Sequence, residues 1–342
     1  MYQLFKPLLF SLSPEKAHEL TVKQLRWATK KPWSRKLIND SYAYTNNRLE
    51  KTVMGLRFNN PIGLAAGFDK NAELVDEMEN LGFGFIEVGT VTPMPQAGNE
   101  KPRLFRLPKD EALINRMGFN NDGVQAMVAR LKLSANRNII VGGNIGKNKT
   151  TLNDDASLDY LTCFHALHEH VDYFAVNVSS PNTPNLRDLQ DKEPLRQLLT
   201  ALRKANLEKK NPKPILLKIS PDLYNEGLQD IVDLVNDINI QGVIAANTTV
   251  FRTYLQTSKA QLNKMGVGGL SGKPLRERST EMIRALRMQL GSEKTIIAVG
   301  GIDSPQAAKE KIEAGADLIQ LYTGLVYQGP GLVKSILKSL AQ

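Results

Sequence analysis

The stretch PIGLAAGFDK, residues 61–70, decides between two folds that the rest of the chain allows. The short apolar run Pro61–Ala65 ends there in the turn AAGFDK. An open doubly wound sheet would carry G-x-G-x-x-G at the turn after its first strand, with an acidic residue about 20 positions further on. AAGFDK does not fit this pattern, so the sequence favours the other fold, a closed parallel barrel.

Downstream of this stretch, predicted strands alternate with predicted helices. Short runs rich in β-branched residues predict the strands Pro61–Ala65, Phe85–Gly89, Ile139–Gly143, Tyr173–Val178, Ile215–Ile219, Val243–Ala246, Thr295–Val299 and Leu318–Leu321. Amphipathic stretches predict the helices Asn71–Leu81, Gly123–Leu133, Ser157–His170, Pro194–Glu208, Tyr224–Ile238, Leu275–Leu290, Pro305–Ala314 and Gly331–Leu340. Eight strands, each followed by a helix over roughly 280 residues, are typical of an α/β (β/α)8 TIM barrel.

Two further pieces precede the barrel. Arg48–Val53 and Leu56–Phe58 predict a β-hairpin at about 46–60, which we expect to cap the floor of the barrel. Residues 1–40 form an N-terminal helical extension. We therefore divide the chain into that extension and a barrel domain over residues 41–342.

The composition excludes several classes of protein. The chain has 342 residues, 42% of them hydrophobic and 23% charged, which is an ordinary globular composition rather than that of a disordered chain. A single cysteine, Cys163, leaves no internal disulfide, four-thiolate zinc site or self-contained iron–sulfur cluster. This cysteine usage suggests a reducing compartment. No apolar stretch approaches the ~20 residues that span a bilayer.

The basic residues are concentrated in the extension. The formal charge is +9, from 44 basic minus 35 acidic residues, and residues 1–40 hold eight basic and three acidic side chains, a balance of +5. Such a surface suits nucleic acid, anionic lipid or an anionic substrate. The same segment carries the apolar residues Phe5, Leu8, Leu9, Phe10, Trp27 and Trp33. This mixture favours peripheral membrane contact over nucleic acid.

Glycines and lysines at the strand ends indicate a site for an anion. In this fold the site is built at the carboxyl ends of the strands. Gly300-Gly301, Tyr322-Thr323-Gly324 and the loop GVGGLSG (266–272) predict a cradle of backbone N–H groups for phosphate, although any one glycine pair could merely turn the chain. Lys70 and Lys218 stand beside strand ends and converge on the same mouth.

Uncharged amides gather at the same strand ends. They suit a planar, amide-rich ligand such as a pyrimidine or a flavin ring, and they are Asn115, Asn144, Asn177, Asn182 and Asn247. Ser179 and Ser180 supply hydroxyls in the strand-four loop, but a serine acts as a base only beside a cation or a stabilising network.

The histidines give no obvious general base. HALHEH (165–170) ends the helix before strand four, with Cys163 on the same helix. Its spacing could suit a metal, but we interpret it as a polar helix end far from the chemistry. We expect no metal site, and we expect Cys163 to be a buried packing residue.

Eight collinear motifs resemble a known family. They are LAAGFDKNAE, EVGTVTPMPQAGNEKPRLFRLP, INRMGFNN, NVSSPNTPNLRDLQ, LLKISPD, ANTT, GGLSG and AVGGIDS. In sequence and order they are similar to the quinone-dependent, membrane-associated class 2 of the dihydroorotate dehydrogenase family. The resemblance implies one FMN per chain and oxidation of (S)-dihydroorotate to orotate, the fourth step of pyrimidine biosynthesis. It also implies ubiquinone or menaquinone as the electron acceptor.

The resemblance also assigns roles to residues. The catalytic base falls on Ser180. Substrate binding falls on Lys70, Asn115, Arg116, Met117, Gly118, Phe119, Asn177, Asn182, Asn247 and Thr248. Flavin binding falls on Ala66, Gly67, Phe68, Asp69, Lys70, Thr90, Asn144, Asn177, Lys218, Ala246, Gly269, Gly301, Tyr322 and Thr323. Relatives often carry threonine at position 246, so a hydroxyl contact there would be lost while a backbone contact would not.

The quinone tunnel and the location are further expectations from the resemblance. His18 and Arg106 fall where the family places polar tunnel residues, although His18 could equally face solvent on an amphipathic helix. With no transit peptide ahead of the extension, we expect a bacterial protein, peripheral on the cytoplasmic side of the inner membrane.

Two other functions remain open on the residues alone. One is a phosphosugar lyase or isomerase in which Lys218 forms a Schiff base. The other is a non-enzymatic barrel that binds phosphate-bearing ligands at membranes.

Overall fold

The computed structural model describes residues 2–134 and 137–342 and contains the predicted barrel. Its strands are β3 (Ile62–Leu64), β4 (Phe85–Val91), β7 (Ile140–Ile145), β8 (Tyr173–Asn177), β9 (Ile215–Ile219), β10 (Gly242–Ala245), β12 (Thr295–Val299) and β13 (Leu318–Leu321). They pair in parallel and close in the order β10-β12-β13-β3-β4-β7-β8-β9. The prediction of a (β/α)8 barrel is confirmed.

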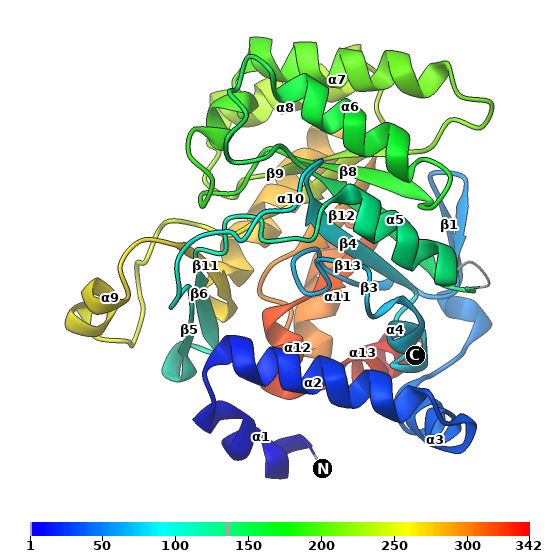
Figure 1. The fold of residues 1–342 in the computed structure, drawn as a ribbon, viewed down its shortest axis with the longest axis vertical. Helices are drawn as coiled ribbons and strands as arrows, with labels where there is room; N and C mark the ends of the chain where they lie inside the picture. The colour runs from blue at the N-terminus through cyan, green and yellow to red at the C-terminus, as the bar shows by residue number, and fades with distance from the viewer. Residues whose placement is uncertain (1, 135–136) are drawn as a thin grey trace.

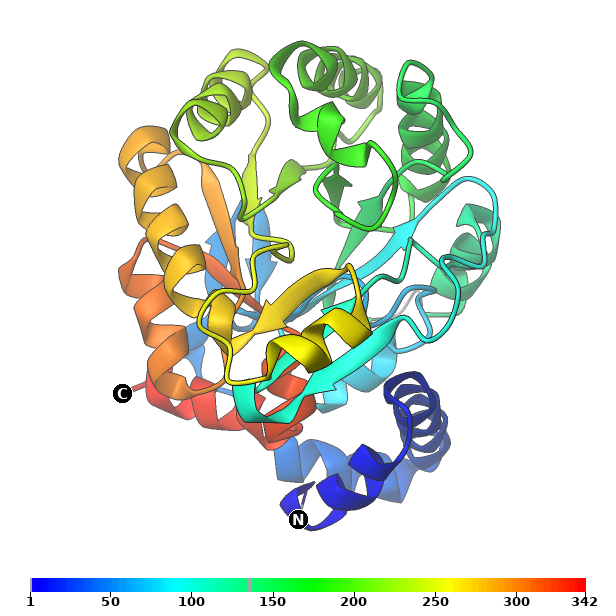
Figure 2. The same ribbon diagram turned by 90° about the vertical axis from the view of Figure 1, so that its left-hand side faces the viewer.

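Helices surround the barrel (Figure 2). They are α4 (Val75–Asn80), α5 (Val124–Leu133), α6 (Ala156–Leu167), α7 (Lys192–Leu207), α8 (Asn225–Asp237), α10 (Arg276–Leu290), α11 (Pro305–Glu313), α12 (Thr323–Gln328) and α13 (Gly331–Leu340). Short 3₁₀ turns lie at η1 (Asn47–Leu49), η2 (Pro108–Asp110), η3 (Leu186–Gln190) and η4 (Lys273–Leu275).

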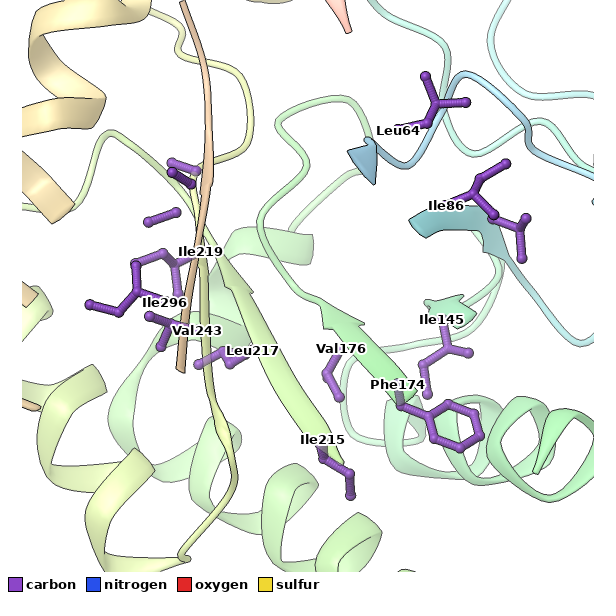
Figure 3. Close-up of a cluster of buried hydrophobic side chains, with 14 of the residues drawn as sticks. Leu64, Ile86, Ile145, Phe174, Val176, Ile215, Leu217, Ile219, Val243 and Ile296 are labelled. Carbon is purple, nitrogen blue, oxygen red and sulfur yellow. The ribbon is translucent and has the colours of Figure 1, made fainter. Parts of the chain in front are cut away.

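Alternate residues of each strand face the helices or the barrel interior. Ile86, Val176 and Leu217 point outward into the main hydrophobic core between strands and helices (Figure 3). Burying each such side chain is worth about 1.5–3 kcal/mol. Inward residues such as Phe85 and Tyr173 form a second, smaller cluster inside the barrel. The same alternation directs polar strand residues into the interior.

A hairpin closes the floor of the barrel. β1 (Lys51–Val53) and β2 (Leu56–Phe58) pair antiparallel, as the sequence pattern suggested. The fully buried Phe58 ring meets Phe85 edge-on, with 5.4 Å between ring centroids. Gly63 on β3 leaves the space that this packing needs, because a Cβ there would lie 2.3 Å from the Phe85 ring.

Three helices precede the hairpin: α1 (Tyr2–Ser11), α2 (Pro14–Thr29) and α3 (Pro32–Tyr42). They lie together beside the barrel, next to α12 and α13 (Figure 1). Val22 and Leu25 of α2 pack against the main core, whereas Trp27 and Trp33 are 64% and 68% exposed. Within residues 2–134 and 137–342, no helix is both long and apolar enough to cross a membrane.

A small antiparallel sheet was not predicted from the sequence. Its strands β5 (Leu104–Leu107), β6 (Ala112–Asn115) and β11 (Gly269–Gly272) are joined in the order β11-β6-β5, and α9 (Lys259–Met265) leads into β11. The expectation that 266–272 is entirely a loop was therefore wrong. Strand β11 pairs with a segment about 150 residues earlier, Gly269 facing Asn115, and no local pattern signals such a long-range pairing.

Candidate active site

A cavity opens at the carboxyl ends of the barrel strands, with the antiparallel sheet as one wall. Most of the residues singled out from the sequence line it together: Ala66, Gly67, Lys70, Thr90, Asn115, Met117, Gly118, Phe119, Asn177, Ser180, Asn182, Lys218, Ala246, Asn247, Thr248, Gly301, Tyr322 and Thr323. The barrel brings these residues together from a sequence span of more than 250 positions because the carboxyl ends of its strands share one face.

Five of the residues assigned to substrate or flavin do not line this cavity. Arg116 turns away from the cavity and donates to the carbonyl oxygens of Val267 (3.0 Å) and Pro102 (2.9 Å). Phe68 lines a second cavity instead. Asn144 is fully buried in β7, behind the cavity wall. The other two, Asp69 and Gly269, do not line this cavity but shape the chain around it.

Asp69 and Gly269 shape the walls of the cavity. The Asp69 carboxylate accepts the backbone N–H groups of Glu73 (2.9 Å) and Leu74 (2.8 Å), which fixes the loop after β3. Burial raises the pKa of Asp69, and these hydrogen bonds oppose the shift. A Cβ at Gly269 would lie 2.0 Å from Thr248 Oγ1, so only glycine permits this approach.

The asparagine side chains form two hydrogen-bonded groups. Asn182 Nδ2 donates to Asn115 Oδ1 at 3.1 Å. Asn177 Nδ2 donates to Thr90 Oγ1 at 2.8 Å, and Asn247 Nδ2 donates to Asn177 Oδ1 at 3.3 Å. Each amide is held by its neighbours before any ligand arrives, so the site is preorganised.

Of the two serines after β8, Ser180 is the one that reaches the cavity. Its Oγ accepts the backbone N–H of Asn182 at 3.2 Å. Ser179 is fully buried, donates to Asn177 Oδ1 at 3.0 Å and accepts from Asn247 Nδ2 at 3.0 Å. Ser180 is therefore placed for chemistry, while Ser179 supports the asparagine network.

Lys70 and Lys218 enter the cavity with different partners. Lys70 Nζ donates to the Gly67 carbonyl oxygen at 2.8 Å. Burial and the nearby Arg103 guanidinium lower the pKa of Lys70 to about 8. Lys218 is buried in β9, and its Nζ lies 3.2 Å from Glu87 Oε1. Both cations therefore stand at the mouth where an anion was expected.

Glu87 is the central residue that the sequence analysis missed. It is fully buried inside the barrel on β4. Its Oε1 accepts from Asn144 Nδ2 (2.7 Å) and Lys218 Nζ (3.2 Å), and its Oε2 accepts from Gln320 Nε2 (2.8 Å) and the Tyr173 hydroxyl (3.3 Å). The available signal was a charged residue in the middle of the apolar run FIEVGTV, at an inward position of the strand.

Glycines of the predicted phosphate cradle line the same cavity. Gly300 and Gly301 both have positive φ, 114° and 70°, and a Cβ at Gly301 would lie 2.4 Å from the Arg276 Cα. Ser271 Oγ and Thr323 Oγ1 are 2.8 Å apart and also line the cavity. Hydroxyls and exposed backbone at one point, with no room for side chains, suit a phosphate group.

A second cavity, with a volume of about 720 Å³, lies between the N-terminal helices and the barrel. Leu9, Val22 and Leu25 are among its apolar lining residues. The two cavities share a wall, because Lys70, Met117 and Tyr322 line both of them.

His18 and Arg106 both line this second cavity. The His18 ring meets Phe68 edge-on at 4.8 Å, and burial together with Lys70 lowers the pKa of His18 to about 4. The alternative of a solvent-facing His18 is wrong. Arg106 donates to the carbonyl oxygen of Leu12 at 2.8 Å, which ties the extension to β5.

The histidine-rich helix end lies away from both cavities. His168 is 2% exposed and packs against Phe164 and Phe174, so that part of the expected polar helix end is in fact buried. Cys163 is buried, as expected, and burial raises the pKa of its thiol. Among the described residues, no cluster of histidine, cysteine and carboxylate side chains could hold a metal.

Comparisons with known proteins identify the family of this chain. The family model for dihydroorotate dehydrogenase matches residues 48–342. The dihydroorotate dehydrogenase (quinone) of Christiangramia forsetii is 56% identical over 98% of this chain and 97% of its own length. That of Gloeobacter violaceus is 49% identical over 100% of this chain and 94% of its own.

Solved structures extend the similarity to the fold. The crystal structure of a dihydroorotate dehydrogenase from Eimeria tenella in complex with ferulenol superposes with a TM-score of 0.84 at 35% identity. It covers 97% of this chain and 93% of the other chain. The chain therefore belongs to the dihydroorotate dehydrogenase family and is an oxidoreductase of its quinone-dependent class.

Proposed function

We propose that this dihydroorotate dehydrogenase holds one FMN in the barrel mouth and oxidises (S)-dihydroorotate there with Ser180 as the base. We further propose that a membrane quinone reaches the flavin from the second cavity. The observation that carries the proposal is the shared wall of Lys70, Met117 and Tyr322, which lets one bound ring face both cavities.

The residues present fit FMN. The wall around Gly301, Ser271 and Thr323 suits its phosphate, and Lys218 offers a cation to the ring. Thr248 Oγ1 is buried at the cavity and has no hydrogen-bond partner within the part of the chain that the structure describes. Buried polar atoms are normally paired, so this hydroxyl indicates a missing ligand.

The chain's own residues bind, orient and deprotonate the substrate. When bound, FMN supplies the hydride acceptor for the oxidation. Lys70 attracts the substrate carboxylate, while Asn115, Asn182 and Asn247 offer amides to the pyrimidine ring. Ser180 takes the proton from carbon five, on the face of the substrate away from the flavin.

The second cavity suits a hydrophobic acceptor. Apolar residues of α1 and α2 line it, with His18 and Arg106 as polar ends for a quinone's carbonyl oxygens. The pKa of His18, about 4, keeps its ring neutral at physiological pH. Exposed Trp27 and Trp33 beside the basic residues of the extension support peripheral contact with anionic lipid on the cytoplasmic side of a bacterial inner membrane.

The alternative functions have less support. Lys218 is ion-paired with the buried Glu87, so its amine is already engaged and is not free to attack a carbonyl and form a Schiff base. A purely binding role for the barrel does not account for the family membership or for a serine placed in the cavity.

Purification tests the cofactor and the reaction together. We expect the protein to be yellow, to release FMN on denaturation, and to be bleached by dihydroorotate without oxygen. A protein that stays colourless after incubation with FMN would refute the proposal.

A further inference from the structure

Gln320 has an unpaired acceptor atom at the floor of the barrel cavity. It lies on β13 between Leu318 and Tyr322, two residues that pack with the inner cluster, so its side chain also points inward. It is 1% exposed and lines the cavity. Among the described residues, no donor lies within hydrogen-bond distance of its Oε1.

Glu87 fixes which way the Gln320 amide faces. A carboxylate can only accept hydrogen bonds, so the Gln320 NH₂ group must point toward it, and the distance from Nε2 to Oε2 is 2.8 Å. Asn144, Lys218 and Tyr173 also donate to this side chain, so both of its oxygens are already occupied by donors. The Gln320 carbonyl is therefore held toward the cavity as an acceptor.

Glu87 holds a cation beside this acceptor. Lys218 Nζ contacts Oε1 of the carboxylate while Gln320 contacts Oε2. The cavity floor therefore offers one hydrogen-bond acceptor next to one positive charge. A complementary ligand edge carries an N–H group next to a carbonyl oxygen, as an imide does.

We propose that Gln320 is a further cofactor-binding residue whose Oε1 accepts the hydrogen bond of the flavin N3–H, and that Glu87 is a positioning residue that orients Gln320 and Lys218. N3–H is the single ring N–H of an oxidised isoalloxazine, and carbonyl groups flank it. Bound to this edge, Lys218 meets the part of the ring that becomes negative on reduction. The inference rests on the proposed FMN site.

A paired comparison of ligands and variants tests the contact. Apoprotein is titrated with FMN and with 3-methyl-FMN, which lacks N3–H, and affinities are measured for wild type and Gln320→Met. Loss of one such hydrogen bond weakens binding by about three- to tenfold. We expect Gln320→Met to lower the affinity for FMN by that factor and to reduce the preference for FMN over 3-methyl-FMN equally.

Gln241→Met is the matched control for a general destabilisation of the barrel by a Gln→Met substitution. Gln241 accepts the Ile215 backbone N–H at 2.8 Å, at the opposite end of the barrel, so its loss should leave FMN affinity unchanged. An unchanged preference for FMN over 3-methyl-FMN in Gln320→Met would overturn the assignment. Equal affinity of the wild-type protein for FMN and 3-methyl-FMN would also overturn the assignment. Wild type that binds neither flavin would refute the FMN site itself.

Glu87→Gln tests the positioning role through the flavin potential. Removing a buried negative charge beside Lys218 stabilises negative charge on the reduced ring, so the midpoint potential should become more positive. Glu87→Asp, which keeps the charge, should restore the wild-type potential in part. A potential that stays unchanged in a folded, FMN-loaded Glu87→Gln protein would remove Glu87 from the account.

Discussion

The barrel mouth and the cavity beneath the N-terminal helices share a wall but are built differently. In the mouth, buried polar side chains hold one another, as where Glu87 accepts four hydrogen bonds inside the barrel. The second cavity is lined by apolar side chains that come from α1 and α2 and also from the barrel, such as Leu9, Leu25 and Leu325. No described residue of α1 is fully buried, so this helix forms the outer side of the second cavity.

This difference separates two tasks: the barrel mouth positions the reacting groups, and the second cavity admits the electron acceptor. Catalysis needs reacting groups held within a fraction of an ångström, and the buried hydrogen bonds of the barrel mouth provide that. A long hydrophobic acceptor needs an apolar opening at the surface, and the cavity beside α1 and α2 offers one. Changes in the mouth should therefore affect substrate oxidation, whereas changes beneath the helices should affect reoxidation.

The largest expected effect is at the base. Ser180→Ala should keep bound FMN but slow dihydroorotate-driven flavin reduction by roughly 10²–10⁴-fold, because carbon five loses its proton acceptor. Stopped-flow absorbance under anaerobic conditions measures this rate. Ser179→Ala should be milder, and Ser180→Cys should retain part of the activity. Reduction of Ser180→Ala at a near wild-type rate would assign the base to another residue.

The next effect is a pH dependence of ligand binding through Lys70. Its pKa of about 8 means that the ammonium is charged below this pH and neutral above it. An anion such as orotate should therefore bind less tightly as the pH rises, by about tenfold between pH 7 and pH 9. Equilibrium titrations of the oxidised protein measure this. Lys70→Arg should flatten the profile, and a flat wild-type profile would exclude Lys70 from anion binding.

The smallest effect concerns the outer surface of the extension. Replacing Trp27 and Trp33 together by glutamine should weaken binding to anionic vesicles a few-fold, and added salt should weaken the wild type. Vesicle co-sedimentation measures this. Met288→Gln is the matched control, since Met288 is 86% exposed on α10. Equal vesicle binding by the wild type, the double variant and Met288→Gln would show that the two tryptophans of the extension do not make the membrane contact.

Much of this molecule was predictable because its signals are local. The strand runs and the glycine, asparagine and lysine residues at their ends lie within single stretches of sequence, and the barrel brings them together. Residue types alone do not distinguish Ser180 from Ser179; the family resemblance assigned the base to Ser180, and the structure shows Ser179 turned into the hydrogen-bond network. Ser179 and Ser180 are adjacent in the chain, so the surrounding sequence does not distinguish them.

The unpredicted parts depend on pairings distant in sequence. Strand β11 pairs with β6, which lies far from it in the sequence. The role of Glu87 depends on Gln320, which is 233 positions away. A charged residue inside an apolar strand was a usable signal for Glu87. It was missed because the sequence analysis considered only the residues at the ends of the strands. Arg116 illustrates the converse, since it sits within a binding motif yet points away from the cavity.

The separation of the two half-reactions is tested most directly in Leu9→Glu. Leu9 lines the second cavity and not the first, so a charge there should obstruct an apolar acceptor and leave the barrel mouth intact. Stopped-flow measurement in one preparation should show flavin reduction by dihydroorotate within about twofold of wild type. Reoxidation by a long-tailed ubiquinone should fall at least about tenfold, equivalent to about 1.4 kcal/mol, while a small soluble dye still accepts electrons. Normal reoxidation by ubiquinone, or equal loss of both half-reactions, would contradict the account.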